Sequence, residues 1–139
     1  MAGLQRLGLL RHARAVALCP WRQCTPAPGQ GIVGADCRVD DRLSAYLLSA
    51  VDQPASRLSA HIERRVLAGL RGGCSLPLGC YARRHGPHWQ AIARLQTPGS
   101  GGSNSSNGNG KHSAITLREA HASGPAQNLA DRLLEQLGH

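Results

Sequence analysis

The chain has 139 residues and a mass of 14.7 kDa, which fits one modest domain, or one domain plus part of another, and excludes a large multidomain enzyme. It contains no Phe, two Trp and two Tyr, so its core must be built from Leu, Val, Ile and Ala. The net charge of +8 comes almost entirely from arginine, because Lys111 is the single lysine. Guanidinium groups bind carboxylates and phosphates through paired hydrogen bonds, so an anionic ligand is expected.

Nucleic acid is not the expected anion, because the arginines are scattered and few aromatic residues are present to stack on bases. No segment approaches the ~18 apolar residues of a membrane span. The N-terminal segment has arginines but no acidic residue before Asp36, a composition that would also suit an organelle transit peptide. Five cysteines without a C-x-x-C pair argue against a disulfide framework and a zinc cluster, and favour reducing surroundings. They are Cys19, Cys24, Cys37, Cys74 and Cys80.

The first half of the chain predicts helices joined by one short strand. Residues 3–18 form at best a short amphipathic helix, and residues 31–38 (GIVGADCR) are typical of a strand. Asp40 and Asp41 are capping residues for a helix whose apolar side chains recur at helical spacing. These side chains are Leu43, Tyr46, Leu47, Ala50 and Val51. A second helix begins near Asp52 or Gln53 and ends at Gly72-Gly73, with Leu58, Ile62, Val66, Leu67 and Leu70 along one side.

The second half predicts a small sheet and a closing helix. Residues 80–84 and 88–96 alternate as strands around a turn at 85–87, and residues 113–120 form a third strand. Between the second and third strands, residues 97–110 are a flexible low-complexity loop rich in Gly, Ser and Asn. A helix with Leu129, Leu133, Leu134 and Leu137 follows Gly124-Pro125. The predicted fold class is α+β.

Three sequence motifs do not indicate functional sites. Residues 29–34 (GQGIVG) satisfy the dinucleotide-binding pattern G-x-G-x-x-G, but prolines precede them and strand-like residues follow. His85, His88 and Cys80 lack a fourth ligand at metal-site spacing, so no metal site is predicted. The glycosylation sequon at Asn104 lies in low-complexity sequence of a chain without a secretory signal.

Cys74 is the candidate reactive residue. A thiol is more often a packed side chain than a nucleophile. Here Gly72 and Gly73 leave the backbone uncrowded for a ligand, just past a helix end. Arg71, Arg83 and Arg84 offer positive charge that would favour the thiolate, against the opposing helix dipole.

Six segments, read in order, resemble successive landmarks of the porphobilinogen deaminase (hydroxymethylbilane synthase) family of tetrapyrrole (haem) biosynthesis. They are residues 2–8 (AGLQRLG), 26–31 (PAPGQG), 37–41 (CRVDD), 62–67 (IERRVL), 72–79 (GGCSLPLG) and 126–130 (AQNLA). The resemblance covers the C-terminal portion of a family member. It implies that residues 1–41 are a remnant of the end of the second domain and the crossover into the first. Residues 42–139 would be the cofactor-anchoring domain, a three-stranded antiparallel sheet with helices on one face.

The resemblance also implies a chemistry. Cys74 would hold a dipyrromethane cofactor through a thioether, and the enzyme, a transferase, would extend it with four porphobilinogen units, releasing ammonia and finally hydroxymethylbilane. Arg6, Gln30, Gly31 and Gly73 are the other candidate cofactor-binding residues. No catalytic residue is assigned, because the family's catalytic aspartate belongs to the first domain, which has no counterpart here.

The expected partners are therefore porphobilinogen and the growing pyrrole chain, with no nucleic acid or membrane, in a protein that is monomeric when full length. The expected location is cytoplasmic, with a plastid or another organelle as the alternative. Two other interpretations stay open. One is a noncatalytic Arg-rich binding module in which Cys74 is a packed thiol, and the other is a pseudoenzyme fragment that completes a separate N-terminal partner.

Overall fold

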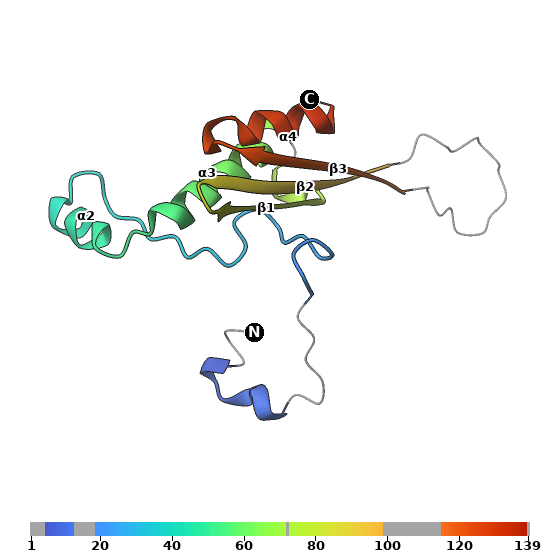
Figure 1. The fold of residues 1–139 in the computed structure, drawn as a ribbon. Helices are drawn as coiled ribbons and strands as arrows, with labels where there is room; N and C mark the ends of the chain where they lie inside the picture. The colour runs from blue at the N-terminus through green and yellow to red at the C-terminus, as the bar shows by residue number, and fades with distance from the viewer. Residues whose placement is uncertain (1–4, 13–18, 72, 99–114, 139) are drawn as a thin grey trace.

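A three-stranded antiparallel sheet organises the chain, and the structure, a computed structural model, describes residues 5–12, 19–71, 73–98 and 115–138 (Figure 1). The strands are β1 (Leu78–His85), β2 (His88–Pro98) and β3 (Ile115–Gly124), in the order β1-β2-β3. The β1–β2 hairpin closes at His85↔His88, which confirms the predicted turn. The third strand continues four residues beyond its predicted end, because Gly124 still pairs with Trp89.

Two helices cover one face of this sheet. The first, α3 (Pro54–Gly69), packs on β1, and α4 (Leu129–Leu137), which follows the short 3-10 helix η3 (Ala126–Asn128), packs on β2 and β3. The limits of α3 have local causes: Pro54 stands in the first turn, where its missing N–H costs nothing, and the C-cap is Leu70. The α+β prediction, with a three-stranded antiparallel sheet and helices on one face, is confirmed.

The core lies between the sheet and these helices. Leucines and branched side chains of α3 and α4 meet mainly alanines of the strands, so the helices approach the sheet closely. Its main members are Ile62, Val66, Leu70, Cys80, Ala82, Trp89, Ala91, Ala93, Leu95, Ala120, Ala122, Leu129, Leu133 and Leu137. Side chains alternate along each strand, so Tyr81, Gln90, Arg94 and His121 point to the opposite face, here called the open face.

Helix α2 (Arg42–Ser49) forms where predicted but does not join this core. Asp41 caps it, accepting hydrogen bonds from the Ser44 N–H at 2.9 Å and the Ser44 hydroxyl at 2.6 Å. None of its residues is buried, and Leu43 and Tyr46 are 70% and 74% exposed. Figure 1 shows α2 projecting beyond the end of the sheet.

Two predictions for the first half are wrong. Residues 32–38 form no strand, because none of them pairs with any of the three strands of the described sheet. In the described part of 3–18, a helical turn at residues 5–6 and the 3-10 helix η1 (Leu9–His12) replace one continuous helix. The break falls at Gly8, whose φ of +66° is incompatible with an α-helix. Residues 3, 4 and 13–18, and the loop predicted at 97–110 from residue 99 onward, lie outside the described residues.

Candidate functional site

Residues 20–31, here called the strap, run along the outer edge of β1. The Cys80 N–H donates to the Pro26 carbonyl at 2.8 Å, so the strap covers part of an otherwise unpaired strand edge. The approach is close: a Cβ at Gly79 would stand 2.8 Å from the Thr25 carbonyl oxygen, so this position requires glycine. The strap also reaches the open face, where the Trp21 and Tyr81 rings lie 5.4 Å apart.

Glu63 joins the strap to the domain. One carboxylate oxygen accepts from the Gly29 N–H at 2.6 Å and the other from the Ala82 N–H at 2.8 Å. The residue is only 3% exposed, and no ion pair joins it to a cation among the described residues. Burial raises the pKa of the Glu63 carboxyl, and the hydrogen bonds from Ala82 and Gly29 oppose that effect. Glu63 therefore ties together helix, strand and strap.

The sequence contains a signal for Glu63. Glu63 stands three residues before Val66 and four before Leu67, within the apolar side of its helix. A carboxylate in such a stripe must find hydrogen-bond donors, since burying it unpaired is costly.

Gln30 and Gly31 belong to a tight turn next to this junction. The Gln30 side chain accepts from the Ala27 N–H at 3.0 Å, so it closes its own turn. Gly29 and Gly31 have φ values of +75° and +85°, a region that glycine adopts without strain. These contacts give the G-Q-G segment a conformational role.

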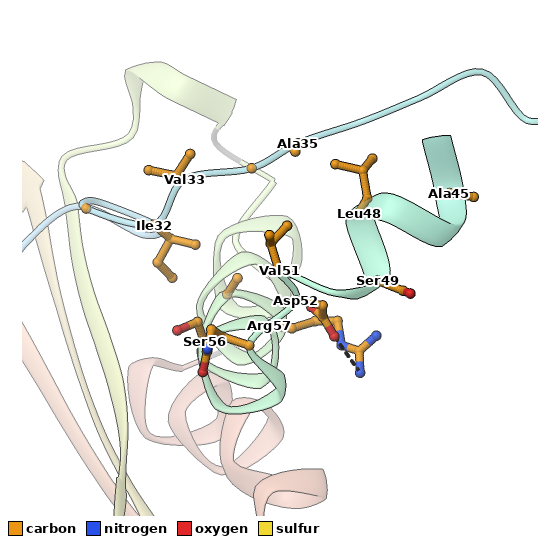
Figure 2. Close-up of a pocket in the computed structure, with 14 residues that line it drawn as sticks. Ile32, Val33, Ala35, Ala45, Leu48, Ser49, Val51, Asp52, Ser56 and Arg57 are labelled. Atoms are coloured by element: carbon orange, nitrogen blue, oxygen red, sulfur yellow. Dashed lines mark ion pairs between the residues drawn. The ribbon is translucent and has the colours of Figure 1, made fainter. Parts of the chain in front are cut away.

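Gly31 also lines a pocket of about 670 Å³. Figure 2 shows residues 32–35 along one side of it, α2 with Leu48 and Ser49 along another, and the first turns of α3 beneath. Asp52 and Arg57 form an ion pair at 3.3 Å in its wall. The pocket thus lies at the N-terminal end of α3.

Cys74 lies at the other end of α3, in the 3-10 turn η2 (Gly73–Ser75) that leads into β1. Its side chain is outside the described part of the structure. Gly73 has a φ of +58°, and a Cβ built there would meet no heavy atom within 4 Å. A Cβ-sized group at Gly73 would therefore stand in open space.

The remaining candidates are not gathered around this turn. The Gly31 pocket extends along α3 as far as Ala60, nine residues before Gly69, so roughly 14 Å of helix separates it from the Cys74 turn. Arg6 is exposed in the N-terminal helical turn. Residues 13–18, which connect that turn to the strap, lie outside the described residues. Among the described residues, Arg6 forms no hydrogen bond with Gly73, Gln30 or Gly31.

Of the three arginines expected near Cys74, one lies next to its turn and two lie far along β1. Arg71 adjoins the turn, but Arg83 and Arg84 stand five and six residues along β1 from Leu78, which is roughly 17–20 Å at strand spacing. Arg84 donates to the Gly86 carbonyl at 3.2 Å and Arg83 to the Gln90 side chain at 3.2 Å. The prediction that these two arginines supply charge to Cys74 is wrong, since an extended strand carries them away.

The other cysteines differ in reactivity. Burial, and secondarily the charge of Glu63, raise the pKa of Cys80 to about 12, so this fully buried thiol is not a nucleophile at neutral pH. Cys19, Cys24 and Cys37 are free and exposed. Among the described residues, no group of three or more His, Cys, Asp or Glu side chains could hold a metal ion. No described helix is long and apolar enough to cross a membrane.

The sheet and the two helices that cover it define an α+β domain. Cys74, the candidate residue for anchoring a ligand, lies just before its first strand. Residues 1–45 match the family model described as porphobilinogen deaminase, dipyromethane cofactor binding domain. The resemblance to this family is therefore confirmed for residues 1–45, a match that ends within α2. Cys74 lies outside the matched residues.

Proposed function

We propose that this chain is the cofactor-anchoring C-terminal part of a hydroxymethylbilane synthase, with dipyrromethane attached to Cys74. The observation that carries the proposal is the match of residues 1–45 to the dipyrromethane-binding family model. The order of the later landmarks, residues 62–67, 72–79 and 126–130, supports its extension to the rest of the chain.

Two features of the structure support this proposal: the surroundings of the Cys74 turn and the contacts that hold the strap on the domain. Gly73 and Ser75, which flank Cys74 in its turn, are exposed. The strap is held on the domain by Glu63 and by the Cys80–Pro26 hydrogen bond, so residues 26–31 and the Cys74 turn are fixed to one rigid core. A rigid scaffold next to the attachment point suits an anchor for a growing chain.

Attachment of the cofactor to Cys74 needs no reagent other than porphobilinogen. The Cys74 sulfur forms a C–S bond to the aminomethyl carbon of one porphobilinogen as the C–N bond breaks, and the thiol proton leaves with the amine as ammonia. The free α-carbon of this first ring then forms a C–C bond to the aminomethyl carbon of a second porphobilinogen as its C–N bond breaks, and the ring proton leaves with the second ammonia. When bound, the dipyrromethane supplies the terminal pyrrole carbon to which four further units are added. In this chain Arg71 is the cation nearest in sequence to Cys74, and it is the first candidate to pair with a carboxylate of the attached group.

Activity in a reconstituted enzyme tests the proposal. The full chain is co-expressed with the N-terminal half of a porphobilinogen deaminase, and porphobilinogen consumption and ammonia release are measured. Cys74→Ser is expected to abolish both, whereas Cys37→Ser, which changes an exposed cysteine outside the turn, retains them. Equal turnover by the Cys74→Ser and wild-type complexes would refute the assignment.

A further inference from the structure

The open face of the sheet carries a second groove, separate from the Cys74 turn. It lies between the start of the strap and the open face of β2 and β3, and its volume of about 520 Å³ is within the usual range for small-molecule sites. The residues that define its chemistry are Trp21, Arg22, Gln90, Arg94, Glu119 and His121. The function proposed above uses none of them.

The groove has an excess of positive charge. Arg94 donates to Glu119 at 2.6 Å and to the Thr25 hydroxyl at 3.0 Å, so one guanidinium and one carboxylate are already paired. The Arg22 guanidinium lies 5.0 Å from the centre of the Trp21 ring. Arg22 has no ion pair with any acid in the part of the chain that the structure describes, so it is available to an external anion.

A third arginine contacts two groove residues. The Arg83 guanidinium lies 4.9 Å from the Trp21 ring centre, and its Nη2 donates to Gln90 Oε1 at 3.2 Å. Its Nε–H is buried and has no acceptor among the described residues. Arg83 therefore adds positive charge beside the Trp21 ring, although it does not itself line the groove.

We infer that this groove binds a small organic monocarboxylate whose body is aromatic or otherwise apolar. Arg22 supplies a fork of donors that matches a carboxylate, and the Trp21 ring offers apolar contact. Inorganic phosphate has no apolar body to contact the Trp21 ring, so the groove favours the carboxylate over it.

The two tryptophans allow a direct test. Trp21 lines the groove, whereas Trp89 is 8% exposed and belongs to the core on the opposite side of the sheet. The indole N–H resonances of the full chain are followed by two-dimensional NMR during titration with sodium benzoate, and separately with benzamide and inorganic phosphate. Saturable movement of the Trp21 resonance with benzoate, with Trp89 stationary, is the expected result. Benzamide and phosphate are expected to bind at least about tenfold more weakly.

Charge reversal at Arg22 provides the matched comparison. Arg22→Glu is expected to weaken benzoate binding at least about tenfold, and Arg22→Lys to retain part of it. Arg64→Glu, which makes the same charge change at an exposed position of α3, is expected to bind like the wild type. The inference is overturned if Trp21 shows no saturable shift, if benzamide or phosphate binds as well as benzoate, or if Arg22→Glu and Arg64→Glu bind equally. Activity of the reconstituted enzyme plays no part in this test, so it stands apart from the Cys74 assignment.

Discussion

Gly29 and Glu63 are 34 positions apart in the chain, and the backbone N–H of Gly29 donates to Glu63 Oε2 at 2.6 Å. Each residue belongs to a segment that carries the family resemblance, the first to residues 26–31 and the second to 62–67. The hydrogen bond gives a physical reason for finding both segments in one chain: the glycine turn presents an N–H, and the buried carboxylate requires it.

Glu63→Ala is expected to destabilise the chain, because it leaves the buried Ala82 N–H and the Gly29 N–H without their acceptor. An unpaired buried donor costs about 1–3 kcal/mol, to be measured by urea unfolding. Faster hydrogen exchange at the Gly29 amide should accompany the loss. The control is Glu135→Ala on the exposed side of α4. A Glu63→Ala variant as stable as this control would contradict the role given to Glu63.

Glu119 gives a pH-dependent contribution to stability. Its hydrogen bond with Arg94, and then that with His121, lower the pKa of the carboxyl from 4.5 to about 2. Because the folded-state pKa lies below the unfolded value, the stabilisation is present above about pH 4.5 and is lost as the pH falls towards 2. The urea midpoints of the wild type and Glu119→Gln should therefore differ at pH 7, differ less at pH 3 and converge towards pH 2, with a modest difference because water screens an exposed pair. A difference that stays constant from pH 7 to 3 would exclude this explanation.

The same substitution should have unequal effects on two helices. Leu133 of α4 is fully buried, and Leu133→Ala is expected to cost about 2–5 kcal/mol of unfolding free energy. Leu43 of α2 is 70% exposed, so Leu43→Ala should change stability by less than about 0.5 kcal/mol. Both variants can be compared by urea unfolding of the full chain. Equal losses would show that α2 packs on the core in solution.

Deletion of residues 100–109 should leave the domain folded. Pro98 pairs with Ile115, so the strand ends lie close together, and the six residues that remain, 99 and 110–114, are enough to connect them. Shortening the connection from 16 to six residues lowers its closure entropy by roughly 1 kcal/mol at most, so the melting temperature should stay level or rise slightly. A large fall in melting temperature would mean that the deleted residues contribute contacts to the fold.

The parts of the fold that follow local rules were predictable from the sequence. Asp41 and Pro54 mark helix starts, Gly86 and Pro87 mark the hairpin, and alternating side chains mark the three strands. Local patterns do not specify whether a strand finds a partner, and the error at residues 31–38 has that cause: the segment is strand-like in composition but pairs with none of the described strands.

Long-range contacts account for the other differences. Arg83 and Arg84 are close to Cys74 in sequence, but an extended strand places them at the far end of β1. Glu63 bonds Gly29, and Trp21 contacts Tyr81 on the open face, because of where the strap lies. The periodicity of the sequence does not encode the position of the strap. The resemblance identified Cys74, Gln30 and Gly31 as candidates, and the structure separates them along α3.

Peptide mapping by mass spectrometry tests the central claim most directly. The chain is co-expressed with an N-terminal deaminase half, the complex is purified, and the cysteine peptides are examined for a covalent dipyrromethane. The account predicts this adduct on the peptide containing Cys74, its loss in Cys74→Ser, and its retention in Cys37→Ser, with the buried Cys80 unmodified in every case. A folded complex with an unmodified Cys74, or with the adduct on another cysteine, would contradict it.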